Sequence, residues 1–467
     1  MANVTEIHDD MIDITEPRLN DDSISEIHYH DYTPQTQANN NSLGHHIKID
    51  INAQDIFTLP STSYISITGQ IRRADNNAAY EPANEITLIN NAMMYLFSSI
   101  KYDLGPTTIE HINHPGQVTS MLGYLTYPDD FSTSAGLTCC WAKDTTIAAN
   151  SYEFERSAEV ASVIAGAAVP AIPVGHFTPI KNPNYNRGFA TRKAYLFKTN
   201  PRGCFTFHIP LDHIFGFAAE YKKLIYGVKH TLTLTRAADT EALHRNGTTN
   251  GKVDITDISW NMQQVKMAPE YLTGLMSVIE QKTPLDLSFQ ARTCEQTTLS
   301  QTLKQTWRLS VTGGVEKPRW IIIGLQTAKS NTQEQNPAVF DNLDLNNAHI
   351  TLNSERYPMR QLNVNFARND YIKLYNMFDA FKKDNLGISN LVGGTQANVE
   401  AFSTLFPILV FDVRRQSEKL KTGVQDIQVR FEFGTIVPAE TMAYAVMLSD
   451  RFFKLSSDGK NMSVMSM

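Results

Sequence analysis

The sequence predicts an all-β protein built from two consecutive halves, each a β-sandwich or jelly roll. Strand-like runs in which apolar and polar residues alternate recur along the chain, and the cleanest is Ile427–Phe433. Turn residues separate these runs at short intervals, which is typical of sandwiches and jelly rolls. Helical segments at 117–127 and 370–383, and opening strands near residues 47 and 285, recur about 240 to 250 residues apart, so the halves repeat a pattern.

The joint between the halves is predicted near residue 268. Two strand-like runs, 228–236 and 253–267, precede it. The second run changes phase at residues 255–258 and again at 262–265. A phase change inside a long strand indicates a β-bulge or a bend. An Ala-Pro pair then ends the run, and helical spacing of apolar residues predicts a linker helix over 268–283.

These signals divide the chain into five segments. They are an acidic flexible arm (1–44), a first jelly roll (45–267) with a long insertion (128–192), the linker helix (268–283), a second jelly roll (284–452) and a C-terminal tail (453–467). The arm holds nine acidic side chains and one basic, a net charge of −8, so the rest of the chain is near +1 when the total is −7. Two interpretations of the arm stay open: it becomes ordered against a neighbouring subunit, or it is simply disordered.

The insertion contains an apolar patch, Val163–Val174 (VIAGAAVPAIPV), in a stretch without a clear period. A loop of this length inside a domain is uncommon and is usually functional. The patch either packs on its own domain or forms a subunit contact, because exposed apolar patches mark partner surfaces.

Composition excludes several classes of protein. With 42% apolar and 19% charged residues the chain is able to bury large cores, and no apolar run reaches the ~18 residues of a membrane-spanning helix. The N-terminal residues lack the basic and apolar regions of a secretory signal. Four cysteines do not make a disulfide framework, so we expect a reducing compartment. A nearly neutral body argues against coating nucleic acid.

The sequence contains only weak candidates for a metal site or a catalytic site. Histidine pairs suggest metal, but no Cys or carboxylate spacing supports them, and adjacent cysteines and adjacent aspartates lack the neighbours that catalysis needs. These candidates are His28, His30, His45, His46, Cys139, Cys140, Asp129 and Asp130. Phosphate-loop, dinucleotide and zinc-protease motifs are absent from the sequence. We therefore predict no catalytic, cofactor-binding or metal-ligating residues, no cofactor, and a protein that is not an enzyme.

Two segments carry a family likeness: IPLDHIFGFAAEYKKLIYGVKHTLTLTRAADTEAL (209–243) and ITDISWNMQQVKMAPEY (255–271). Softer support comes from residues 86–104, 140–145, 186–192, 317–329, 336–358 and 370–381. With these residues the chain resembles the double jelly-roll major capsid proteins of the Polinton (Maverick) and adintovirus group of DNA viruses and virus-like transposons. The likeness spans nearly all of residues 45–455. Residues 402–433 depart from it, because an extended acidic loop expected there is missing.

The resemblance implies two eight-stranded jelly rolls joined by the linker helix, in a structural protein without enzymatic activity. It implies homotrimers of pseudo-hexagonal outline that tile an icosahedral shell, located in the virion and assembled inside the host cell. The implied partners are other copies of the chain and penton or minor capsid proteins, with no sequence-specific binding of nucleic acid. An underlying membrane is left undetermined.

Three alternatives remain open from the sequence. The first is a carbohydrate-binding or carbohydrate-processing protein on two jelly rolls, which would need convergent carboxylates or a metal cluster at one end of a sandwich. The second is a minor vertex protein, although those resemble single rolls. The third is a host-genome copy of a transposon capsid gene that no longer assembles.

Overall fold

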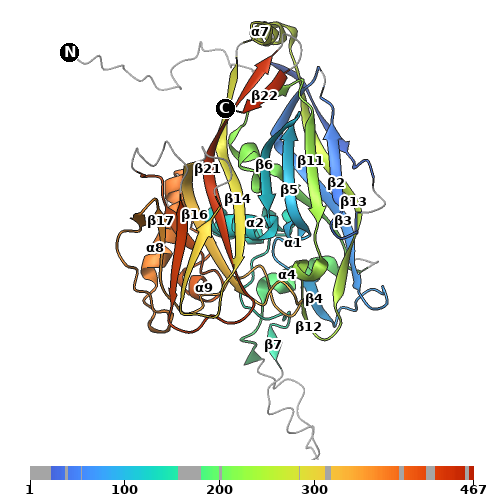
Figure 1. The fold of residues 1–467 in the computed structure, drawn as a ribbon. Helices are drawn as coiled ribbons and strands as arrows, with labels where there is room; N and C mark the ends of the chain where they lie inside the picture. Colours follow the sequence, from blue (N-terminus) through green and yellow to red (C-terminus); the bar gives the residue numbers. More distant parts are fainter. Residues whose placement is uncertain are drawn as a thin grey trace, which may run out of the picture.

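The computed structural model places two β-sandwiches side by side, with a helix between them (Figure 1). It describes residues 23–36, 40–53, 55–155, 180–198, 202–282, 284–310, 317–388, 394–416, 426–457 and 462–466. Each sandwich has one five-stranded and one four-stranded antiparallel sheet. The predicted all-β class with two jelly rolls is confirmed. The apolar patch at 163–174 lies outside the described residues.

In the first roll, one sheet has the strand order β1-β13-β3, followed by β9 and β10, and the other has the order β2-β11-β5-β6. Because β9 and β10 pair with different parts of β3, they share one position in the sheet. The strands are β1 (Ile24–Tyr32), β2 (His46–Ile51), β3 (Phe57–Arg73), β5 (Phe97–Leu104), β6 (Thr107–Asn113), β9 (Cys204–Pro210), β10 (Ile225–Tyr226), β11 (His230–Arg236) and β13 (Gly251–Met267).

The second roll repeats this topology. Its sheets have the orders β14-β21-β16-β19 and β15-β20-β17-β18, and β22 pairs with the end of β21. In each roll the first strand (β1 or β14) therefore forms a sheet edge and pairs with the long last strand (β13 or β21). The strands are β14 (Leu285–Thr298), β15 (Lys304–Leu309), β16 (Lys317–Thr327), β17 (Leu345–Leu352), β18 (Glu355–Tyr357), β19 (Leu409–Asp412), β20 (Ile427–Phe433), β21 (Thr441–Ser457) and β22 (Met462–Ser466).

Helices occupy the ends of the rolls and the space between them. Helix α7 (Pro269–Glu280) follows β13 at one end of the molecule, where the sequence predicts a helix, and β7 lies at the opposite end (Figure 1). The other elements are α1 (Ala92–Tyr95), α2 (Pro115–Thr126), α4 (Arg187–Leu196), α5 (Leu211–Ile214), α6 (Gly216–Glu220), α8 (Ile372–Leu386), α9 (Val399–Thr404), the 3-10 helices η1 (Asp129–Thr133), η2 (Ala135–Cys139), η3 (Asp239–Ala242) and η4 (Phe366–Arg368), and the strand pairs β4 (Glu85–Leu88) with β12 (Leu243–Asn246) and β7 (Phe154–Glu155) with β8 (Ile180–Lys181). Helices α2 and α8 are the two segments predicted at 117–127 and 370–383.

The phase changes predicted in the last strand of the first roll are register shifts of β13 against β3. The first lies between Ile255 and Asp257, where Thr256 is one extra residue. The second lies between Asn261 and Gln263, opposite a stretch of β3 at 60–63. The alternation therefore resumes on the correct face after each bulge, and Ile258 and Trp260 stay buried.

The arm predicted over residues 1–44 is wrong for its second part. Strand β1 pairs with β13 from Ile24 to Tyr32, and the Asn41 side chain bonds both the N–H and the carbonyl of Ile255, at 2.7 and 3.2 Å. All side chains of β1 before Tyr32 are exposed, so the strand has no buried face to produce a hydrophobic signal. Backbone pairing to the edge of β13 holds it instead.

The segment predicted as a C-terminal tail, 453–467, is also partly strand. Strand β21 continues to Ser457, and β22 returns to pair with it, with Met462 and Val464 buried. The Thr107 hydroxyl of β6 donates to the carbonyl of Val464 at 3.2 Å, so the end of the chain touches both rolls.

A single hydrophobic core runs through both rolls. Helix α2 is almost entirely buried between them (Figure 1). The hydroxyls of Tyr95 and Tyr124 donate across the boundary to the carbonyls of Pro337 and Ala338, both at 2.9 Å. The two rolls are therefore packed as one body through apolar contact and satisfied polar groups.

Candidate functional site

The sequence candidates do not form a reactive centre in the structure. His28 and His30 lie on the exposed strand β1, and Asp129 forms an ion pair with Lys143. Cys139 and Cys140 are buried, and burial raises the pKa of each thiol to about 12, so their thiolates are scarce at neutral pH. Across the described ranges, no group of three or more His, Cys, Asp or Glu side chains is placed to hold a metal ion.

The strongest constellation of polar groups is the seam where β14 of the second roll meets the first roll. The backbone N–H groups of Gln290 and Arg292 donate to the carboxylates of Glu220 and Glu110, at 2.9 and 2.7 Å. The Arg292 guanidinium donates to the carbonyls of His213 and Asp212, at 2.6 and 3.2 Å. The first roll thus satisfies donors of an edge strand that would otherwise be open for pairing.

Glu110 is the central acceptor of this seam. It is fully buried on β6 and also receives the N–H groups of Gly216 and Phe217, at 3.2 and 3.1 Å, which begin helix α6. Burial raises the pKa of this carboxyl, while Arg292 and the three N–H donors oppose the shift. One side chain therefore fixes a strand, a helix and the neighbouring roll at the same point.

Close approach at the seam depends on a residue without a side chain. A Cβ atom on Gly216 would collide with the carbonyl oxygen of Gln290. Beside it lies a cavity of about 230 Å³ bounded by α2, α5, α6, β14 and α8. The rings of Phe217 and Phe289 pack edge to face with centroids 5.6 Å apart, so the seam combines polar and apolar contact.

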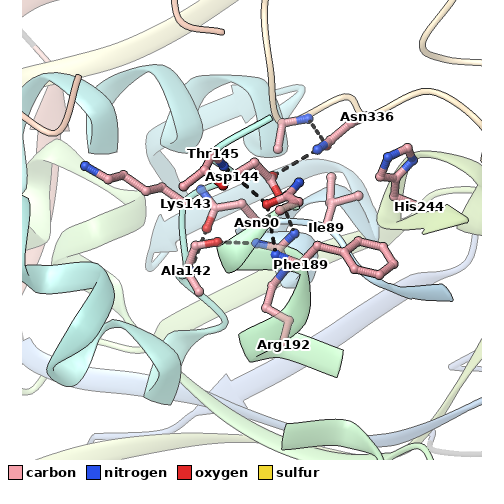
Figure 2. A network of polar contacts seen from close by, with 12 residues as sticks. Ile89, Asn90, Ala142, Lys143, Asp144, Thr145, Phe189, Arg192, His244 and Asn336 are labelled. Atoms are coloured by element: carbon pink, nitrogen blue, oxygen red, sulfur yellow. Dashed lines mark hydrogen bonds and ion pairs between the residues drawn. The ribbon is translucent and has the colours of Figure 1, made fainter. Parts of the chain in front are cut away.

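A second buried polar centre joins the insertion to both rolls (Figure 2). Asp144 accepts from Arg192 at 2.7 Å and from Asn186 and Asn336 at 2.9 Å each. The Arg192 guanidinium also donates to the carbonyl of Leu88 at 2.8 Å, and both charged side chains are at most 1% exposed. Loss of one partner from such a pair costs about 3–5 kcal/mol, because it leaves a buried charge uncompensated.

Sequence reasoning missed both polar centres. Asp144 and Arg192 fall in the insertion that lacked a clear period, and Glu110 and Arg292 are ordinary strand residues about 180 positions apart in the chain. The available signal was indirect. Asp144 and Arg192 lie in two of the segments that gave weaker support to the family likeness, CWAKDT and NRGFATR.

Residues 182–453 match the family described as the double jelly roll-like domain, which covers more than half of the 467 residues. The chain belongs to this family. No curated protein matches it. The match includes β9 to β13 of the first roll and the second roll as far as Phe453, so the family assignment rests on both halves of the fold.

Solved structures share the fold of this double jelly roll-like protein at low sequence identity. A chain in the structure of the Sputnik virophage aligns with a TM-score of 0.58 and 12% identity, covering 100% of this chain and 93% of that one. A chain of the PBCV-1 virus capsid gives 0.52 and 8%, covering 97% and 99%. The Faustovirus major capsid protein gives 0.52 and 9%, covering 96% and 92%. In the part of the chain that the structure describes, no helix has the length and apolarity to cross a membrane.

Proposed function

We propose that this protein is a major capsid protein, a structural subunit that acts by self-association and catalyses no reaction. The observation that carries the proposal is the double jelly roll that aligns over nearly its full length with chains of virus capsids. The buried seam supports it, because it holds the two rolls in one fixed arrangement, which a repeating shell subunit needs. The protein would then be located in the virion and assembled inside the host cell.

The finer form of the proposal is a homotrimer of pseudo-hexagonal outline in an icosahedral shell. Three chains of two similar rolls place six similar sandwiches around one axis, so a single gene product fills a hexagonal lattice site. The segments at 209–243 and 255–271 support a DNA virus or virus-like transposon of the Polinton or adintovirus type. Penton or minor capsid proteins would be the further partners.

The test is the mass and shape of the full-length protein in solution. Gel filtration with light scattering, followed by negative-stain microscopy, should show trimers or closed particles in some range of salt and pH. The chain has a mass of 52.4 kDa, so a trimer is readily separated from a monomer. A protein that stays monomeric under every condition would contradict the proposal.

The carbohydrate alternative gains no support from an observation in the described residues. Such a site would need carboxylates or a metal cluster converging at one end of a sandwich. The buried carboxylates found here, Glu110 and Asp144, are instead bonded to backbone N–H groups or to Arg and Asn side chains. We therefore propose only the capsid function.

A further inference from the structure

The contact between the two rolls of one chain is not symmetric, because each roll contributes a different surface. The end of the first roll that carries β6, α2 and α6 meets the edge strand β14 of the second roll (Figure 1). Because the two rolls share one topology, the second roll has an equivalent of the first contact surface, and the first roll has an equivalent of β14. The equivalents are the β18/α8 end, formed by β18, the 358–371 segment and α8, and the edge strand β1.

Both equivalent surfaces are uncovered in the single chain. Strand β1 exposes Ile24, Ile27 and Tyr29, at 44, 46 and 58%. Its counterpart β14 instead has two backbone N–H groups bonded to carboxylates of the first roll. The β18/α8 end exposes Met359 at 90% and Ile372 at 46%. These two surfaces lie at opposite lateral extremes of the molecule: α8 is on one side, and β13, which carries β1, is on the other (Figure 1).

The β18/α8 end is also hollowed where the in-chain seam would place a partner. A mostly apolar cavity of about 310 Å³ lies between Tyr357, Pro358, Met377, Ala380 and Phe411. It is built from the last strand of one sheet, α8 and β19, as the 230 Å³ cavity beside β14 is built from α2 and its neighbours. In the first roll the cavity beside α2 is bounded in addition by Gln290 and Arg292 of β14, which belongs to the second roll.

Charge complements this geometry. Residues 23–36 contain two acidic residues and no Lys or Arg, a net charge of −2 with neutral histidines. Residues 355–373 contain four basic and two acidic residues, a net charge of +2. On β18, the Nε and Nη2 atoms of Arg356 are buried without a hydrogen-bond partner in the described chain. The opposite net charges of the two surfaces favour the docking of the 23–36 segment on this end.

We infer that β1 of one copy docks on the β18/α8 end of a second copy, repeating between chains the contact that joins the rolls within a chain. This inference rests on the proposed function and adds the surfaces that build the capsomer. The contact is heterologous, since one end of a chain meets the other end of the next. Such contacts form a closed ring when the rotation between neighbours closes, and three chains would close a ring of six rolls.

Photo-cross-linking tests which surfaces meet. The full-length chain would carry p-benzoyl-phenylalanine in place of Tyr29, and a matched chain would carry it in place of Tyr271, which is 56% exposed on α7. Irradiated trimers of the first chain should yield intermolecular links to peptides within 355–388, and trimers of the second should not. Trimers in which Tyr29 links elsewhere, or gives no intermolecular link, would overturn the inference while leaving the capsid function standing.

A charge introduced at the same end gives an independent measurement. Met359→Asp should raise the dissociation constant of the trimer at least about tenfold, because the interface would bury an unpaired charge. Ile436→Asp, at a side chain 64% exposed between β20 and β21, should leave it unchanged. Equal association of both variants would overturn the inference. A wild-type chain that never associates would instead overturn the proposed function, and this inference with it.

Discussion

At the scale of single residues, the structure depends on a few side chains whose partners lie far away in the chain. Glu110 and Asp144 each bind groups from two distant segments of the chain, and Gly216 allows a backbone contact between rolls. Such positions tolerate little change, because buried polar groups lose their partners and packed glycines have no space for a Cβ atom.

Gly216→Ala should lower the stability of the protein. The new Cβ atom meets a backbone oxygen of Gln290, which cannot move without shifting β14. We expect a loss of about 1–3 kcal/mol, seen as a lower thermal midpoint. Gly274→Ala in α7 is the matched control, since its Cβ would face open space and alanine favours a helix by roughly 0.5–1 kcal/mol. Equal thermal midpoints for the two variants would contradict the close contact between Gly216 and Gln290.

His230 should make the stability depend on pH. It is fully buried, with Tyr102 and Thr58 hydroxyls at 2.7 and 2.9 Å, and burial lowers its pKa to about 3. In the unfolded chain the imidazole of this histidine has its ordinary pKa near 6.5. Above pH 6.5 the group is neutral in both states and costs no stability. As the pH falls from 6.5 toward 3 only the unfolded chain binds the proton, so the free energy of unfolding decreases. At pH 5 this group alone costs about 2 kcal/mol.

The measurement for His230 is the free energy of unfolding from pH 7.5 to 4.5. His230→Gln keeps a hydrogen-bonding side chain that does not titrate, so the slope with pH should become shallower. His208→Gln, at an exposed side chain on β9, should leave the slope as in the wild type. A His230→Gln variant with the wild-type slope would show that the buried imidazole does not control it.

At the scale of elements, β1 and β22 each pair with the long last strand of a roll, and β1 does so without a buried face. Strand β1 pairs with eight residues of β13 and exposes nearly every side chain, and β22 pairs with five residues of β21. A strand of this kind protects the edge of its neighbour, because an uncovered long strand invites pairing with other chains.

Removal of residues 1–36 should therefore damage the fold, and removal of residues 1–22 should not. The longer deletion takes β1 away and uncovers the edge of β13, which we expect to lower the thermal midpoint by several degrees and to promote aggregation. The shorter deletion removes none of the described contacts. If both deletions gave the wild-type midpoint and solubility, β1 would not belong to the folded sheet.

The shorter deletion also tests the remaining hypothesis about the arm. The arm was expected to become ordered against a neighbouring subunit, and the shorter deletion asks whether residues 1–22 take part in such a contact in addition to β1. A loss of particle yield with an unchanged thermal midpoint would support the hypothesis. An unaltered yield would contradict it.

At the scale of the whole molecule, the two rolls share one core and one seam. They should then unfold together, although each has the topology of a separate domain. We expect a single calorimetric transition in which the calorimetric and van't Hoff enthalpies agree for the monomer. Two resolved transitions would show that the seam is too weak to couple the rolls.

The sequence predicted well the strands that have one buried face. It missed strands that are held by pairing with a distant segment of the chain. The alternation of Ile427–Phe433 matches β20, and the phase changes near residues 256 and 263 match the bulges of β13. Strand β1 was missed because none of its side chains before Tyr32 is buried, so no hydrophobic period exists to detect. The 453–467 segment was missed because it alternates only in short pieces.

By itself, the sequence determined the all-β class, the two halves, the helix between them and the lack of a recognisable catalytic motif. These follow from local periodicity and turn residues, which act over a few positions. Only the tertiary structure decided that β14 is sealed by Glu110 and Glu220, that Asp144 and Arg192 pair in the insertion, and that β1 and the β18/α8 end remain uncovered. Those facts depend on which distant segments meet, and a periodic pattern carries no information about its partner.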